Sequence, residues 1–294
     1  MLKTIAIIIA GITAISFAAI FIRFCDDVPA IMIATYRLGI ASLVLLVIFR
    51  FKGLTLRGID RKDLLFSLLG GVFLSLHFIL WITSLKYTSV ASSVVLVTTN
   101  PIFVGIFSYF FLREKQPIEL IAGICLCFLG SFIIAIGDSG FHGFTLTDKG
   151  ALIGDALALA GAVMASGYLI VGSKVRERLD ILTYITVVYS ISAIFLLITS
   201  MALQIPFTGY KPSSYLFLAM LAVVPQLIGH TSLNWALKHL KASMVAITIL
   251  GEPIGAAILA YLFFTESVGR LQLLGMAMIF AAIIIASRKG KKIE

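Results

Sequence analysis

Charged residues are scarce in this sequence. Asp, Glu, Lys and Arg make up 13% of its 294 residues, whereas 60% are hydrophobic. Soluble domains contain about 25% charged and about 45–50% apolar residues. A soluble fold could not bury this much apolar surface, but a bilayer, which a helix of about 20 apolar residues can cross, supplies an apolar solvent. The composition therefore predicts an all-α integral membrane protein without a sizeable domain outside the bilayer.

Cysteine is rare as well, and Cys25, Cys125 and Cys127 lie in or beside apolar segments. Three cysteines without metal-ligand spacing argue against a disulfide framework and against a zinc site. The sequence also lacks a phosphate-binding glycine loop, a His-Glu-x-x-His motif and an aspartate cluster that could hold magnesium. We therefore expect no cofactor, no bound metal and no enzymatic activity, ATP hydrolysis included.

The net charge of +9 could indicate a nucleic-acid partner. However, the basic residues lie in short loops beside apolar segments, which is the positive-inside pattern of membrane proteins, so no nucleic acid is expected. The first apolar run, Thr4 to Phe24, is too long for the core of a cleaved signal peptide. We interpret it as a retained first transmembrane helix.

Ten apolar segments separated by turn signals predict ten transmembrane helices. They lie near residues 4–24, 29–49, 64–84, 89–111, 118–136, 150–171, 181–203, 213–235, 242–264 and 270–287, with Gly137 to Gly140 as the turn after the fifth. Seventeen Lys and Arg residues fall in the two termini and one set of alternate loops, and five fall in the other set. This asymmetry places both termini in the cytoplasm. We expect the protein in the cytoplasmic membrane of a prokaryote.

A shift of 152 residues superposes two parts of the sequence without a gap. The matching positions include Lys86 with Lys238, Pro101 with Pro253, Tyr109 with Tyr261, Glu114 with Glu266 and Gly123 with Gly275. Halves of five helices each, here 1–140 and 141–294, must enter the membrane in opposite orientations. Such inverted repeats are typical of secondary transporters, whose substrate sites lie near the midplane between the halves. A duplicated scaffold without transport is the alternative.

Several short motifs give the sequence a family resemblance. They are Arg37, the segment Ser84 to Ala91, Pro101-Ile102-Phe103 and Leu112 to Lys115, with Ala236 to His239, Gly251-Glu252-Pro253 and Thr265-Glu266 in the second half. As a set they resemble the drug/metabolite transporter superfamily, specifically its EamA-type members, over essentially the whole chain. The resemblance implies ten helices around a central cavity and transport without ATP hydrolysis. Members commonly export amino acids, other metabolites or toxic compounds, so the resemblance does not fix the substrate.

Glu252 is the sharpest functional candidate. It lies about ten residues into its predicted helix, or roughly 15 Å deep at about 1.5 Å per residue, near the middle of a core of about 30 Å. An acid there is costly and should face a cavity or a partner, so it is a candidate for proton coupling. Alternatively it stays protonated and holds the kink that Pro253 predicts, or it pairs with a neighbouring helix. Its repeat partner, Asn100, is polar but cannot titrate.

Arg37 lies inside the second predicted helix. It could bind a carboxylate or phosphate of the substrate. It could equally snorkel, pair with Glu252 or bond to backbone carbonyls. We favour a structural role, because the family resemblance places an arginine here in members with different substrates.

Polar residues at helical spacing supply the remaining candidates. Gln226, His230 and Asn234 are each four residues apart, so they should stack on one face, which we expect to line a cavity rather than to bond other helices. His77, Trp81 and Ser84 could contact an amphipathic substrate, although Trp81 could instead belong to the interface belt. Tyr168 and Tyr109 are weaker candidates, and Asp155 is expected to be a polar helix-end residue.

The sequence therefore predicts a secondary transporter that exports a small metabolite, such as an amino acid or a related amphipathic compound, by alternating access. Possible proton coupling would involve Glu252. A membrane-embedded enzyme and a non-transporting scaffold or channel are the alternatives. The sequence leaves monomer and homodimer equally open.

Overall fold

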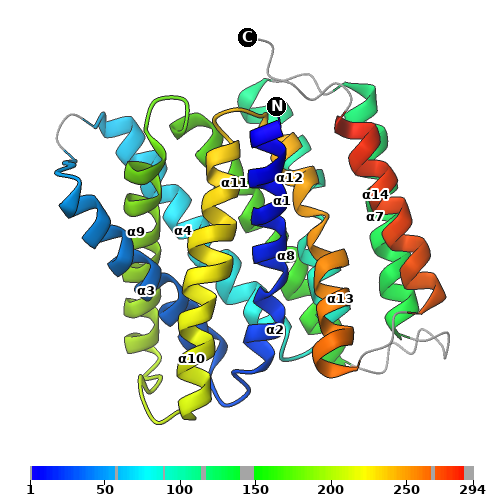
Figure 1. The fold of residues 1–294 in the computed structure, drawn as a ribbon, viewed down its shortest axis with the longest axis horizontal. Coiled ribbons are helices and arrows are strands. Elements are labelled where there is room, and N and C mark those ends of the chain that lie inside the picture. The colour runs from blue at the N-terminus through cyan, green and yellow to red at the C-terminus, as the bar shows by residue number, and fades with distance from the viewer. Residues whose placement is uncertain are drawn as a thin grey trace.

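The computed structural model describes residues 2–56, 59–88, 90–113, 117–139, 149–265 and 269–287. Over these ranges the chain forms a bundle of helices without a strand (Figure 1). Eight of the described stretches are long and apolar enough to cross a membrane. The all-α membrane architecture that the composition predicts is therefore confirmed.

The helices follow one another in the order expected from the apolar segments. Up to Ser139 they are α1 (Leu2–Ser16), α2 (Ala18–Arg23), α3 (Ala30–Phe51), α4 (Arg61–Ser84), α5 (Val90–Val97), α6 (Asn100–Leu112) and α7 (Ile118–Ser139). From Lys149 onward they are α8 (Lys149–Val175), α9 (Ile181–Ala202), α10 (Pro212–Leu221), the π-helix η1 (Ala222–His230), α11 (Thr231–Ala236), α12 (Ala242–Ile249), α13 (Glu252–Phe264) and α14 (Arg270–Ser287).

Some predicted helices are interrupted, and one is longer than predicted. The first helix breaks at Phe17, the fourth between Val97 and Asn100, and the ninth between Ile249 and Glu252. The predicted turn at Gly137 is wrong, because α7 continues through Ser139. Glycine favours turns but does not forbid a helix that packing supports.

The described ends of several helices repeat at the interval found in the sequence. α5 and α12 span equivalent residues 152 positions apart, and so do α6 and α13. Arg113 and Thr265, which terminate α6 and α13, both adopt a left-handed conformation with φ of 54°. The two halves therefore share their helix breaks as well as their sequence motifs. Glu114 and Glu266 of the repeat lie outside the described residues, as does the predicted boundary between the halves at 140.

The ten-helix count depends on α7 and α14. Their apolar stretches, Ile118–Gly130 and Leu273–Ala282, are shorter than the eight that qualify as spans. The two helices pack against each other at the side of the bundle (Figure 1). A Cβ atom on Gly130 would lie 2.7 Å from the carbonyl oxygen of Gly275, so glycine permits this close approach.

Glycine also lets α1 approach its neighbours. A Cβ on Gly11 would lie 2.7 Å from Cβ of Ser232, and one on Gly229 would lie 3.3 Å from the Gly11 carbonyl oxygen. A Cβ on Gly255 would likewise lie 2.7 Å from Cβ of Ser16. α1 is thus held tightly against η1, α11 and α13.

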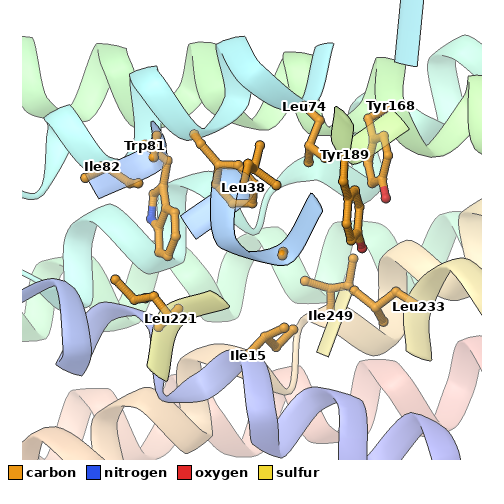
Figure 2. Close-up of a cluster of buried hydrophobic side chains, with 14 of the residues drawn as sticks. Ile15, Leu38, Leu74, Trp81, Ile82, Tyr168, Tyr189, Leu221, Leu233 and Ile249 are labelled. Carbon is orange, nitrogen blue, oxygen red and sulfur yellow. The ribbon is translucent and has the colours of Figure 1, made fainter. Parts of the chain in front are cut away.

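A single large apolar cluster joins both halves (Figure 2). It includes Ile15 of α1, Leu38 of α3, Leu74 of α4, Tyr189 of α9 and Leu221 of α10, all buried. Because helices from both halves contribute, this cluster packs the two halves against each other.

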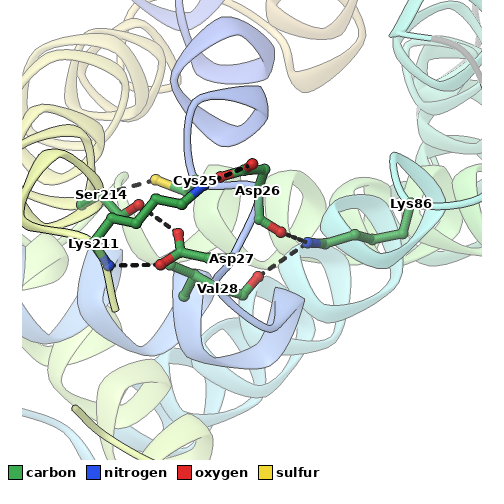
Figure 3. A network of polar contacts seen from close by, with 7 residues as sticks. All are labelled: Cys25, Asp26, Asp27, Val28, Lys86, Lys211 and Ser214. Atoms are coloured by element: carbon green, nitrogen blue, oxygen red, sulfur yellow. Dashed lines mark hydrogen bonds and ion pairs between the residues drawn. The ribbon is translucent and has the colours of Figure 1, made fainter. Parts of the chain in front are cut away.

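A polar network ties the α2–α3 loop to the start of α10 (Figure 3). Lys211 pairs with Asp26 at 2.9 Å, and its backbone N–H donates to Asp27 at 2.6 Å. Ser214 donates to Asp27, and Lys86 donates to the Val28 carbonyl oxygen at 3.0 Å. The network therefore closes this end of the bundle between helices of both halves.

These contacts lower the carboxyl pKa values at this end. The hydrogen bond from Lys211 lowers the pKa of Asp26, and the hydrogen bonds from Ser214 and the Lys211 backbone lower the pKa of Asp27. Their contribution to stability is therefore present above the ordinary carboxyl pKa of about 3.9 and is lost as the pH falls through the lower folded-state values. The tie should remain intact throughout the neutral range.

Gly130→Ala should destabilise the protein, because the new methyl group meets backbone atoms that cannot rotate away. Overpacking of this kind costs about 1–3 kcal/mol. Gly39→Ala, where a Cβ would meet nothing within 4 Å, is the matched control. Thermal unfolding of both variants in detergent measures the difference, and an equal melting temperature for the two would contradict the close contact.

Cys25 offers a probe of the network. Burial, followed by the charge of Asp27, raises the pKa of its thiol to about 12, so labelling by a maleimide at neutral pH should be slow. In a background without Cys125 and Cys127, Asp27→Asn should accelerate labelling, because it weakens the tie and removes the charge. Asp60→Asn, which affects a cap at the start of α4, should leave the rate unchanged.

Candidate functional site

A cavity of about 40 Å³ lies at the centre of the bundle. Helices of both halves line it. Its polar lining comprises Arg37, His77, Trp81, Thr98, Asn100, Tyr168, His230 and Glu252. Ile15, Leu169, Leu233 and Ile249 supply apolar wall between them. The arrangement can hold an amphipathic molecule away from lipid.

The predicted site residues divide into two groups. Arg37, His77, Trp81, Asn100, Tyr168, His230 and Glu252 line the cavity. Gln226 and Asn234 are fully buried and are not part of its lining. The sequence thus brings most candidates to one place, although their roles there are matters for experiment.

Of Gln226, His230 and Asn234, which the sequence predicts to share one cavity-lining face, His230 is among the residues that line the cavity. Pro225 lies within η1, a π-helix that contains Gln226 and ends at His230. His230 lines the cavity, whereas Gln226 and Asn234 bond to the lining residues Arg37 and Tyr168.

Arg37 is fully buried, and neighbours from both halves hold its side chain. Its Nε donates to Oε1 of Gln226 at 2.8 Å, and its guanidinium carbon lies 4.0 Å from the centre of the Phe78 ring. Its two terminal nitrogens have no hydrogen-bond partner within the described part of the chain. The guanidinium is therefore oriented by its inner nitrogen, and its outer nitrogens are buried without a hydrogen bond to the described residues.

Glu252 and Asn100 occupy equivalent positions in the two halves. Each is the first residue of a helix that follows a break, and each is followed by a proline at a position where the missing N–H costs nothing. Glu252 is 8% exposed and Asn100 is 3% exposed. The breaks therefore turn an acid and an amide toward the cavity, and the Oδ1 atom of Asn100 has no partner among the described residues.

Aromatic rings form one wall of the cavity. His77 stacks on Trp81 with ring centres 6.0 Å apart and planes 7° apart, and its Nδ1 lies 3.0 Å from the Gly161 carbonyl oxygen. His230 lies 6.5 Å from the rings of both His77 and Tyr168. Trp81 therefore lines the cavity beside the two histidines.

Asn234 supports this wall from behind. The Tyr168 hydroxyl donates to its Oδ1 at 2.7 Å, and its Nδ2 donates to the Tyr189 hydroxyl at 3.3 Å. Sequence reasoning missed Tyr189 and Phe78, because no spacing or motif distinguishes either residue from the core residues around it. Only the packing of separate helices reveals that they support polar cavity residues.

Three of the other candidates, Ser84, Tyr109 and Asp155, lie outside the cavity. Ser84 bonds to Ser93 and to the Trp81 carbonyl oxygen, and Tyr109 is 60% exposed. Asp155 accepts a hydrogen bond from Thr88 at 3.0 Å near the start of α8. None of these residues is among those that line the cavity.

A multi-pass helical membrane protein with a polar cavity between repeated halves has the architecture of a membrane transporter. The chain matches the EamA-like transporter family twice, over residues 2–136 and 152–288, and it belongs to that family.

Named relatives agree with this family. The chain is 26% identical to a transporter of Clostridium kluyveri, with 89% of this chain and 84% of that protein covered. It is 25% identical to the pseudopaline exporter CntI of Pseudomonas aeruginosa, with 90% and 88% covered. It is 26% identical to mouse solute carrier family 35 member G1, with 85% and 68% covered.

A protein of known crystal structure shares the fold. It superposes with a TM-score of 0.78 at 17% sequence identity, and the alignment covers 97% of this chain and 96% of that one.

Asn234→Ala should destabilise the protein by about 1 kcal/mol or more, since it leaves the buried hydroxyls of Tyr168 and Tyr189 without this partner. His230→Ala should cost less, because its Nδ1 has no partner in the described structure to lose. Thermal unfolding in detergent compares the two variants. A larger loss for His230→Ala would contradict the assignment of Asn234 as the supporting residue.

Proposed function

We propose that the protein is a secondary transporter that exports a small amphipathic metabolite, such as an amino acid or a related compound, by alternating access through the central cavity. The observation that carries the proposal is the cavity itself, which lies where the two halves meet and is lined by an arginine, a glutamate and aromatic rings. In inverted-repeat transporters the substrate site occupies this position, and rocking of one half against the other exposes it to each side in turn.

The topology proposed for this cycle has ten transmembrane helices in two inverted halves, residues 1–140 and 141–294, with both termini in the cytoplasm of a prokaryote. Two observations support it. The helix breaks repeat at an interval of 152 residues, and α1 begins at the same end of the bundle at which α14 ends (Figure 1). An even number of crossings brings both ends to one side.

Export is favoured over uptake by the relative that carries an export function in its name, the pseudopaline exporter. The transporter names of the relatives also favour transport over the alternatives of a membrane-embedded enzyme or a scaffold. Uptake into proteoliposomes tests this directly with a panel of amino acids, other metabolites and lipophilic cations. Saturable flux that a competitor inhibits is the expected result, whereas flux that never saturates would indicate a channel.

Proton coupling is proposed at Glu252. The titratable or charged groups that line the same cavity are Arg37, His77, Tyr168 and His230. A carboxyl group in this setting can exchange its proton as the cavity opens to each side, and its neighbour Arg37 can respond to the change in charge. Asn100, at the equivalent position of the first half, cannot titrate, so only the second half would carry the coupling proton.

Glu252→Gln should abolish the dependence of flux on a pH gradient, because the amide cannot carry a proton. Flux down a substrate gradient should persist. Asp155→Asn, which changes a carboxyl group outside the cavity, is the matched control and should retain coupling. If a pH gradient drives flux in Glu252→Gln at the wild-type level, the coupling role is contradicted, while the transport function is not.

A further inference from the structure

The two outer guanidinium nitrogens of Arg37 can donate hydrogen bonds that they do not make to any described residue. The residue is fully buried and lines the cavity, yet these two nitrogens have no hydrogen-bond partner in the described structure. A buried cation without a partner is strongly unfavourable, so such a group requires an anion for at least part of the working cycle.

Glu252 does not fill this role in the observed conformation. Ion pairs within 4.0 Å among the described residues join Arg178 to Asp63 and Lys211 to Asp26, and none joins Arg37 to Glu252. The two groups line one cavity without forming an ion pair, so the outer nitrogens of Arg37 stay unpaired there among the described residues.

We propose that Arg37 is a receptor for the carboxylate of the transported molecule. This inference rests on the proposed function and adds the chemical class of the substrate, a monocarboxylate with an apolar or aromatic body. Two outer nitrogens of one guanidinium match the two oxygens of a carboxylate in a bidentate pair. The aromatic wall formed by His77 and Trp81 receives the body of the molecule.

The charge of the cavity favours a carboxylate over a phosphate. Arg37 is the only Lys or Arg among the lining residues, and Glu252 is the only acid. A dianionic phosphate would meet one cation and one potential carboxylate, which repels it. A monoanion, or a zwitterion whose ammonium group faces Glu252 and the unpartnered Oδ1 of Asn100, balances the two charges.

Gln226 is a positioning residue for this receptor. It accepts from Nε, the one guanidinium nitrogen that a bidentate pair through the outer nitrogens leaves unused. Phe78 covers one face of the same group at 4.0 Å. Together they direct the outer nitrogens without competing for the ligand.

Binding to the purified full-length protein in detergent tests the inference independently of transport. The probes are 3-phenylpropionate, its neutral isostere 3-phenylpropionamide, and phenyl phosphate, with affinity measured by titration calorimetry at constant pH. We expect 3-phenylpropionate to bind about 10-fold or more tightly than the amide, since a charge-assisted pair is lost in the amide. Phenyl phosphate should bind more weakly than 3-phenylpropionate.

Three variants locate the effect. Arg37→Gln should equalise the affinities for the acid and the amide. Gln226→Glu should do the same while keeping the fold, because it supplies an internal carboxylate to Arg37, and so it serves as the test if Arg37→Gln does not fold. Arg178→Gln, which removes a partly exposed ion pair outside the cavity, should retain the preference for the acid.

Three results would overturn the inference: the amide binds as tightly as the acid, none of the probes binds, or Gln226→Glu retains the full preference for the acid. Saturable flux of a neutral or cationic compound in a protein without acid binding would leave the proposed transporter function in place. Preference for the acid without any saturable flux would support the carboxylate site at Arg37 and contradict the proposed transporter function.

Discussion

In the hydrocarbon core of a membrane, backbone N–H and C=O groups must find partners within the protein, because no water is available to them. A helix satisfies this requirement along its whole length, so an interruption is tolerated only where protein or a cavity surrounds it. The breaks before Asn100 and Glu252 obey this rule, since both residues are buried and both line the central cavity. The position of the cavity, the repeat of the breaks and the polar groups at its wall all follow from this constraint.

The same constraint explains how so few polar residues organise the centre of the protein. Gln226 and Asn234 bond to cavity residues from behind, and the aromatic rings of Phe78 and Tyr189 complete their surroundings. The Arg37 guanidinium bonds to Gln226 through Nε, and its two outer nitrogens make no hydrogen bond within the described part of the chain. A carboxylate substrate and the Glu252 carboxyl could then occupy Arg37 in turn, which offers a physical link between substrate binding and proton exchange.

Much of this arrangement could be predicted from the sequence. The lengths of the apolar runs predict the helices, and the 152-residue register marks Asn100 and Glu252 as equivalent positions. The π-helix around Pro225 and the hydrogen bonds of Gln226 and Asn234 are not predicted, because they depend on residues of other helices that sequence spacing does not bring together. The sequence favours a structural role for Arg37, and only the structure shows that its two outer nitrogens lack hydrogen-bond partners among the residues it describes.

Access to the cavity from the two sides of the membrane tests the central claim most directly. Ala165 lines the cavity on α8 and is buried. In a cysteine-free background, Ala165→Cys in proteoliposomes should react with a membrane-impermeant thiol reagent added to either side in turn, and 3-phenylpropionate should slow both reactions. Labelling from one side only, or labelling that the acid does not affect, would contradict an alternating-access cavity that binds its substrate at Arg37.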